Sequence, residues 1–151
     1  MTRWLALDHG HKRIGVAVGN TQDSFATPLT VLDAEPSADL PDHICKISEE
    51  YQIDGIVVGL PLNMDDTIGP QALEALRFAT EIVQRTGLDV RMWDERLSSF
   101  DADKALAGHL TRKKRRARQD SIAAASFLQD FLQSNGPNSA KRPKDFTEQT
   151  G

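Results

Sequence analysis

The sequence predicts an α/β fold in which helices pack against a mixed β-sheet. Three short apolar segments open the chain without a helical pattern between them, and apolar strands then alternate with amphipathic helices. Strands that alternate with helices usually pair in parallel, because the helix carries the chain back to the same edge of the sheet. The 151 residues are about enough for one domain, which we place at residues 1–133.

The first half of the chain is expected to hold four strands and two helices. A turn containing Gly10 joins the first two strands, so their pairing is expected to be antiparallel. Apolar residues from Leu40 to Tyr51 follow helical spacing, and Pro70 and Gly87 mark the two ends of a second helix. The expected strands are residues 3–8, 13–19, about 27–33 and 53–59, and the expected helices are about 40–51 and 70–86.

The second half is expected to add one strand and two helices. A strand at 88–93 precedes a helix at about 100–109, and a last helix covers 119–133. The basic segment 112–118 is expected to be a loop, because six like charges in seven residues repel one another. Residues 134–151 contain glycine and proline and few apolar residues, so this tail is expected to be disordered.

Acidic residues stand at the ends of three apolar segments. Asp8 ends the run from Trp4, Asp94 and Glu95 end the strand at 88–93, and Asp120 opens the last helix. Carboxylates are rarely buried unless they are paired or bind a cation. Three such segments therefore predict one shared site, and a hard divalent cation with oxygen ligands is the expected occupant.

Residue spacing indicates which way two of these acids point. Trp4 and Asp8 lie on one face of a strand, whereas Asp120 lies on the helical stripe of Ala124 and Phe127. Both acids are therefore expected to face the core side of their elements. The alternatives are a turn aspartate at Asp8 and a helix-capping aspartate at Asp120.

Asp94 and Glu95 are neighbours in sequence, and strand geometry would point them to opposite faces. Only one of them is then expected to join Asp8, and the other is expected to partner Arg96 or a backbone amide. Spacing alone leaves open which of the two does so.

Basic and polar residues near the acids are the candidate contacts to a polyanion. The basic segment carries +6, so the rest of the chain carries −10 against a total of −4. A cationic segment close to Asp120 can contact phosphates without reading bases. A solvated charged loop is the alternative. The expected contacts are Lys12, Arg13, Asn63, Thr67, Arg112, Lys113, Lys114, Arg115, Arg116 and Arg118.

Together these features predict metal-dependent hydrolysis of a phosphodiester. Three converging carboxylates can hold one or two Mg²⁺ or Mn²⁺ ions, which activate a water and stabilise a leaving oxygen. The lone Cys45 excludes an internal disulfide and a zinc site of several thiolates. No apolar run is long enough for a membrane span or a signal peptide, so a cytoplasmic protein is expected. The oligomeric state is not determined by the sequence, and a monomer is the expectation.

Four sequence motifs resemble those of the YqgF/RuvX family. They occur in the family's order and span about residues 3–133. The matching segments are residues 5–17, 57–65, 94–99 and 120–129.

The resemblance implies a ribonuclease H-like fold with a five-stranded mixed sheet whose first three strands are antiparallel. It implies a nuclease that matures the 5′ end of precursor 16S ribosomal RNA, with Holliday-junction resolution as the older proposal. By motif, Asp8, Glu95 and Asp120 are the expected catalytic, metal-binding acids. The resemblance thereby selects Glu95 over Asp94.

This chain departs from the family pattern at three places. His11 stands where threonine is common, Gly19-Asn20 stands where serine-aspartate is common, and Asp66 stands where glycine is usual. The first is expected to alter phosphate or metal contacts, the second to remove an auxiliary carboxylate, and the third to change the shape of a loop.

Three other functions compete with a precursor-rRNA nuclease. A resolvase of branched DNA would use the same fold and the same phosphate contacts. A non-catalytic nucleic-acid-binding factor would not need all three acids, which are present here. A sugar-kinase-like ATP binder can open with a similar Asp8-x-Gly10 motif, but a single domain lacks the second lobe that would close over ATP.

Overall fold

The computed structural model describes residues 1–10, 12–36, 38–97 and 112–150, except the side chains of Leu97, 112–119 and 147–150. Five strands form one sheet: β1 (Arg3–His9), β2 (Arg13–Asn20), β3 (Ala26–Asp33), β4 (Gly55–Leu60) and β5 (Asp89–Asp94). Their order across the sheet is β3-β2-β1-β4-β5. The pairs β1–β2 and β2–β3 are antiparallel, and β1–β4 and β4–β5 are parallel. The predicted mixed sheet is therefore confirmed.

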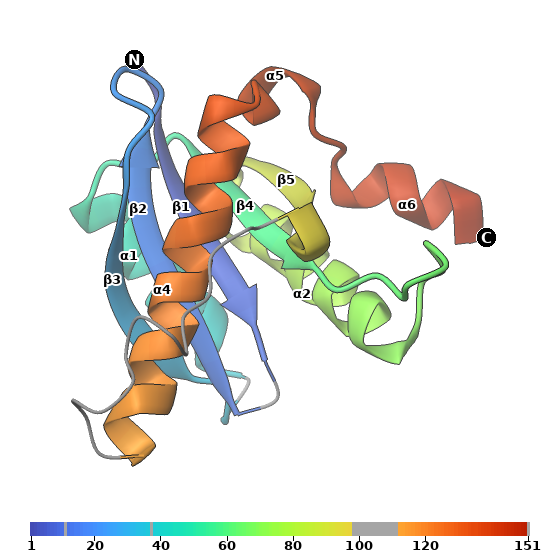
Figure 1. Cartoon of the computed structure of the whole chain (residues 1–151), viewed down its shortest axis with the longest axis horizontal. Coiled ribbons are helices and arrows are strands. Elements are labelled where there is room, and N and C mark those ends of the chain that lie inside the picture. The colour runs from blue at the N-terminus through green and yellow to red at the C-terminus, as the bar shows by residue number, and fades with distance from the viewer. Residues whose placement is uncertain (11, 37, 98–111, 151) are drawn as a thin grey trace.

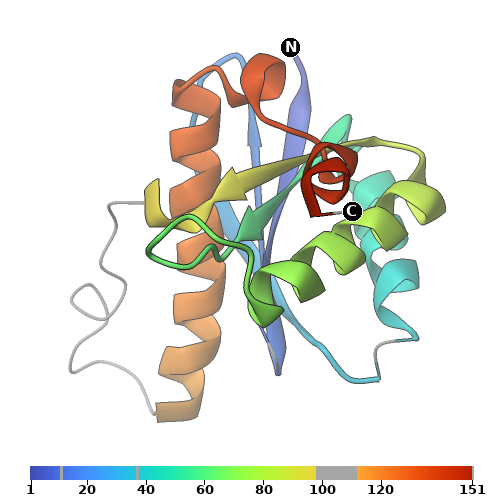
Figure 2. The ribbon, with the colours of Figure 1, turned by 90° about the vertical axis from the view of Figure 1, so that its right-hand side faces the viewer.

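Helices cover both faces of this sheet. They are α1 (Leu40–Glu50), α2 (Pro70–Thr86), the 3-10 helix η1 (Glu95–Leu97), α4 (Arg112–Gln133), α5 (Gly136–Ser139) and α6 (Pro143–Thr150). Helix α4 lies across one face, whereas α1 and α2 lie on the other (Figures 1 and 2). The helix expected at 100–109 falls outside the described residues. Among the helices described, none combines the length and the hydropathy that crossing a membrane requires.

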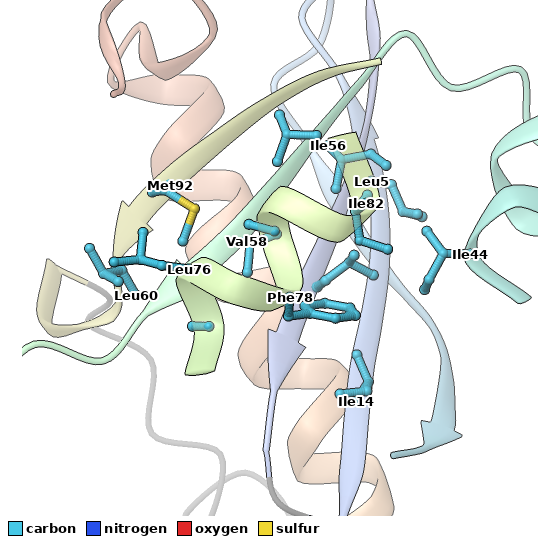
Figure 3. Packing of buried hydrophobic residues seen from close by; sticks show 14 of the residues in the cluster. Leu5, Ile14, Ile44, Ile56, Val58, Leu60, Leu76, Phe78, Ile82 and Met92 are labelled. Atoms are coloured by element: carbon cyan, nitrogen blue, oxygen red, sulfur yellow. The ribbon is translucent and has the colours of Figure 1, made fainter. Parts of the chain in front are cut away.

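The alternation of side chains along β1 divides the interior into two cores. Leu5 and Leu7 point to the α2 face, where they join an aliphatic core with Ile56 and Leu76 (Figure 3). Trp4 and Ala6 point to the α4 face and pack against the apolar stripe of that helix, which includes Ala124, Phe127, Leu128 and Phe131. Asp8 continues the row of Trp4 and Ala6, so the predicted orientation of β1 is confirmed.

The basic segment is helical, which corrects the expectation of a loop at residues 112–118. Helix α4 begins at Arg112 and runs without interruption into the apolar stripe. Lys and Arg have high helix propensity, and the segment contains no glycine or proline. The charge repulsion that predicted a loop is therefore outweighed by propagation from a helix that is anchored to the sheet.

The segment 134–151, expected to be disordered, contains α5 and α6 in the structure. Its connection to β5 explains the difference. The backbone N–H of Met92 donates to the carbonyl of Lys141 at 2.8 Å, and Arg91 Nη1 donates to the carbonyl of Ala140 at 2.6 Å. Phe146 packs against the α2-side core. The segment thus covers the edge strand β5, whose backbone groups would otherwise be exposed.

Candidate active site

The carboxyl ends of β1, β4 and β5 meet at one edge of the sheet, because these three strands are parallel. Asp8 lies near the end of β1, and Glu95 follows β5 directly in η1. Ligands of sheets with helical crossovers bind at this edge. The topology therefore brings two of the three predicted acids together from segments almost ninety residues apart in sequence.

The carboxyl groups of Asp8 and Glu95 share a hydrogen bond. Burial, the hydrogen bond to Asp8 and the charge of Asp8 together raise the pKa of Glu95 to about 9. The pKa of Asp8 is also raised, first by burial and then by the charge of Asp120, although the hydrogen bond from Glu95 opposes this. At neutral pH, therefore, Glu95 keeps its proton and donates it in a hydrogen bond to the Asp8 carboxylate.

Gly59 on β4 makes room for Glu95. A Cβ at this position would overlap the Oε1 atom of Glu95, closer than van der Waals contact allows. The Glu95 side chain therefore folds back over the main chain of β4, toward Asp8. Glycine within a strand often marks such a close approach.

Gly15 on β2 allows a similar close approach of α4. It pairs directly with Asp8, and a Cβ here would overlap the main-chain carbonyl of Asp120. Asp120 lies more than two turns after Arg112, the first residue of α4, so the helix-capping alternative is excluded. Its carboxylate accepts a hydrogen bond from Arg13 Nε at 2.7 Å.

The three acids suit a hard cation by chemistry, because all their donor atoms are oxygens. Asp8 and Glu95 are in contact, and the charge of Asp120 is close enough to raise the pKa of Asp8. Within the described part of the chain, no group of three His, Cys, Asp or Glu side chains is already arranged around a metal position. The proton on Glu95 and the Arg13 guanidinium reduce the repulsion among these three carboxyl groups.

Asp94 pairs with Arg96 instead of joining Asp8, as predicted for one of the two adjacent acids. Its carboxylate accepts hydrogen bonds from the Arg96 backbone N–H at 3.0 Å and from Nη2 at 2.8 Å. The hydrogen bonds from Arg96 lower the pKa of Asp94. Asp94 therefore stays charged and turns away from the Asp8–Glu95 pair.

Asn63 and Thr67 lie in the loop that follows β4 at this same edge. Asn63 Nδ2 donates to Thr67 Oγ1 at 2.8 Å, and the Asn63 backbone N–H donates to the Thr67 carbonyl at 3.0 Å. The two residues thus brace the loop. Asp66 between them has φ of 70°, a conformation that glycine adopts easily, and its carboxylate accepts from Arg96 Nη2 at 2.6 Å.

The predicted basic contacts differ in their placement. Lys12 is exposed in the turn between β1 and β2, whereas Arg13 is held by Asp120. The cations Arg112, Lys113, Lys114, Arg115, Arg116 and Arg118 lie on the first two turns of α4, where only the backbone is described.

Two departures from the family pattern can be placed. Asn20 pairs with Arg3 at the far end of β1 and β2, five residues from Gly15 and so about 17 Å along the strand from Asp8. The expected loss of an auxiliary carboxylate is therefore wrong, because an acid there would not reach the site. Asp66 adopts the positive φ that glycine favours, and its carboxylate adds an ion pair with Arg96. His11 falls outside the described residues.

Sequence reasoning missed several residues around the acids. Gly15 and Gly59 make room for Asp120 and Glu95, and glycines inside apolar strands are a signal that reveals such positions. Gln71 and Glu74 of α2 line a pocket of about 120 Å³ beside Glu95. No pattern in the sequence predicts that these two helical residues reach the site.

Comparison with known proteins supports a specific family. Residues 2–134 match the family model described as "RuvX: Holliday junction resolvase". Relatives from Clostridium botulinum and Roseiflexus sp. are each 38% identical over 133 residues, which is 87% of this chain and 97% and 94% of theirs. Both carry the name "Putative pre-16S rRNA nuclease".

Solved structures share the fold at low sequence identity. RuvC of Thermus thermophilus in complex with a Holliday junction substrate has a TM-score of 0.58 and 14% identity, covering 93% of this chain and 99% of that one. The fowlpox virus Holliday junction resolvase has a TM-score of 0.52 and 11% identity, covering 88% and 99%. The fold is therefore ribonuclease H-like, and with the match over residues 2–134 the chain belongs to the RuvX family.

Proposed function

We propose that this protein is a cytoplasmic, Mg²⁺- or Mn²⁺-dependent nuclease that hydrolyses phosphodiester bonds at the 5′ end of precursor 16S rRNA. Asp8, Glu95 and Asp120 are its proposed metal-binding and catalytic acids. The observation that carries the proposal is the partly buried Asp8–Glu95 pair at the carboxyl ends of β1 and β5. Two carboxyls in contact need a cation or a proton between them, and pairs of this kind are typical of active sites.

In this proposal the protein residues hold and orient the reacting groups. A bound Mg²⁺ or Mn²⁺ supplies an activated water and stabilises the charge on the leaving oxygen. Asp8 and Glu95 would bind it through carboxylate oxygens, with Glu95 giving up its proton. Arg13 orients Asp120 through the 2.7 Å hydrogen bond, and partial burial strengthens each of these electrostatic interactions.

Substrate binding is assigned to the cations on the first two turns of α4 and to the rim of the β4–α2 loop. A helix whose first two turns carry six cationic residues, close in sequence to Asp120, suits contact with a phosphate backbone. The names of the relatives favour precursor 16S rRNA. Phosphate contacts alone do not distinguish RNA from DNA, because that difference lies in the 2′-hydroxyl.

A second candidate function is resolution of branched DNA. The family description and both structural neighbours name Holliday junctions. The same acids and the same cations would serve this reaction, so substrate choice is the point to be tested.

The test is a cleavage assay with Mg²⁺ or Mn²⁺ on precursor 16S rRNA 5′ ends and on four-way DNA junctions. We expect metal-dependent cleavage of the RNA and weak or absent cleavage of the junction. The reverse preference would favour the resolvase. Tight binding without cleavage of either substrate would favour a non-catalytic binding factor.

Asp120→Asn tests the assignment of the acids within that assay. It keeps the shape of the side chain but loses the charge that an ion requires, so RNA binding should persist while cleavage falls by orders of magnitude. Asp42→Asn is the matched control, since Asp42 lies on α1 and pairs with Arg85 on the opposite face of the sheet. Cleavage by Asp120→Asn at the rate of the control would show that the assignment is wrong.

Replacing Arg112, Lys113, Lys114 and Arg115 together with glutamine tests the role of the helical cations. Affinity should fall for all RNA sequences alike, and the dependence of log affinity on log salt should become shallower. Glutamine also forms helices well, so the start of α4 should persist. Unchanged affinity and salt dependence would refute phosphate binding by this segment.

A further inference from the structure

Arg96 connects the two segments that border the Asp8–Glu95 pair. Its Nη2 atom donates to Asp94 at 2.8 Å and to Asp66 at 2.6 Å, and its Nε atom donates to Asp94 at 3.0 Å. Its Nη1 atom donates to the carbonyl of Asn63 at 2.9 Å. One guanidinium therefore ties the turn after β5 to the loop after β4, across thirty residues of sequence.

The turn that Arg96 closes contains Glu95. The backbone N–H of Arg96 donates to Asp94 Oδ1 at 3.0 Å, and the guanidinium grips the same carboxylate. Glu95 thus lies between Asp94 and Arg96, whose side chains are hydrogen-bonded to each other. This fixes the backbone at Glu95 and with it the direction in which its side chain leaves the chain, over Gly59 and toward Asp8.

The loop on the other side of Arg96 is braced internally. Thr67 donates from its hydroxyl and from its backbone N–H to Asp65 Oδ1, at 2.6 and 3.1 Å. The Asp66 backbone N–H donates to the Asn63 carbonyl at 2.9 Å. These hydrogen bonds hold the loop in one conformation. Arg96 therefore connects the Glu95 turn to a loop that is itself well ordered.

Resting on the proposed function, we infer that Arg96 is a positioning residue that holds the Glu95 carboxyl against Asp8 by clamping η1 to the β4–α2 loop. It acts through Glu95 and does not itself contact substrate. Asp66 is the outer anchor of this clamp, because its carboxylate accepts a hydrogen bond from Arg96. Glycine at this position would offer no such acceptor. Residues that orient metal ligands typically change metal affinity or activity by about 10–100-fold when they are removed.

The competing role for an arginine at this edge is direct contact with a substrate phosphate. The hydrogen bonds argue against it, because the guanidinium N–H groups are already directed at Asp94, Asp66 and the loop carbonyls. The two roles also predict different measurements. A phosphate contact contributes to the salt dependence of binding, whereas a positioning residue does not.

The test compares wild type with Arg96→Gln, Arg96→Lys and Asp66→Gly. Mn²⁺ affinity is measured by calorimetry without nucleic acid, kcat and KM are measured on precursor rRNA, and the salt dependence of RNA binding is recorded. For Arg96→Gln we expect Mn²⁺ affinity and kcat to fall about 10–100-fold, with KM and the salt slope unchanged. Arg96→Lys should lose less affinity than Arg96→Gln, because it keeps the positive charge. It should not reach the wild-type value, because one ammonium cannot bridge both segments.

Asp66→Gly removes only the outer anchor and keeps the backbone conformation, so it should cause a smaller loss in the same direction. Arg85→Gln is the matched control, because Arg85 pairs with Asp42 at the surface, away from the site. Unchanged Mn²⁺ affinity in Arg96→Gln, or a shallower salt slope in that variant, would overturn the inference.

The inference can fail separately from the proposed function. Wild type that binds no Mn²⁺ and cleaves nothing would defeat the proposed function. A crystal structure of Arg96→Gln then decides the role of Arg96 alone. We expect the Glu95 carboxyl to have left Asp8 in that structure, and finding the two carboxyls still in contact would overturn the positioning role.

Discussion

The two faces of the sheet are built from the same strands and end differently at the carboxyl edge. On the α2 face, the buried apolar rows run as far as Leu7, Leu60 and Met92, and the polar residues His9 and Asp94 follow them at the ends of β1 and β5 (Figure 3). On the α4 face, the row of Trp4 and Ala6 ends at Asp8. On the middle strand β1, the α2-face row thus stays apolar up to Leu7, whereas the α4-face row is apolar only up to Ala6 and then carries a carboxylate.

This difference lowers the stability of the α4 face at its carboxyl edge. An aliphatic side chain at position 8 would have extended the α4-side core, as Leu7 extends the core on the other face. Instead the α4 face places carboxyl groups near one another and raises the pKa values of Asp8 and Glu95. Groups that destabilise the free protein in this way are expected at functional sites.

The largest expected contrast comes from two adjacent residues of β1 that point to opposite faces. Leu7→Ala should lower the free energy of unfolding by about 2–5 kcal/mol, because Leu7 is fully buried. Asp8→Asn should change stability little and abolish cleavage, because it removes a charge from a repulsive site. Urea unfolding and cleavage rate per folded molecule measure both. Loss of cleavage without loss of stability in Leu7→Ala would contradict the division between the faces.

The two glycines at the edge allow a finer comparison. Gly15→Ala should cost about 1–3 kcal/mol, since its Cβ would press on the rigid main chain of α4 at Asp120. Gly59→Ala meets only the flexible end of Glu95, so it should leave stability nearly unchanged while weakening Mn²⁺ binding. Thermal melting and calorimetry distinguish them. Equal stability losses in the two variants would contradict this distinction between contact with rigid main chain at Gly15 and contact with a flexible side chain at Gly59.

The last comparison concerns the pH dependence of stability. As pH rises from 4.5, the ordinary pKa of a glutamate, to about 9, the unfolded chain releases the Glu95 proton before the folded protein does. Stability of the metal-free protein should therefore fall over this range, by at most about 1.4 kcal/mol per pH unit. Glu95→Gln cannot lose a proton and should show a flatter profile in urea unfolding. Parallel profiles for the two proteins would count against a protonated Glu95.

Patterns local to one element were predictable from the sequence. The period of two along β1 gave the orientation of Asp8, and the helical stripe placed Asp120 on the sheet side of α4. The adjacency of Asp94 and Glu95 required one to turn away, but only the 3-10 turn after β5 shows which one does. Metal binding by these acids stays a prediction.

Features that depend on distant partners were not predictable. The start of α4 at Arg112 was misplaced because a run of charges favours solvent exposure but does not by itself decide between helix and loop. Residues 134–150 hold few apolar residues, yet the free edge of β5 gives Lys141 a backbone partner. The contact of Arg96 with Asp66 likewise joins residues thirty apart.

The most direct test of the central claim is a calorimetric titration of Mn²⁺ near neutral pH into wild type, Asp8→Asn and Asp42→Asn, in two buffers with different heats of ionisation. We predict saturable binding to wild type and to Asp42→Asn, with release of a proton from Glu95, because this carboxyl would have to be deprotonated to bind the ion. Asp8→Asn should bind at least tenfold more weakly (about 1.4 kcal/mol or more). Equal binding to all three proteins, or no binding to wild type, would contradict the claim that these acids form the metal site.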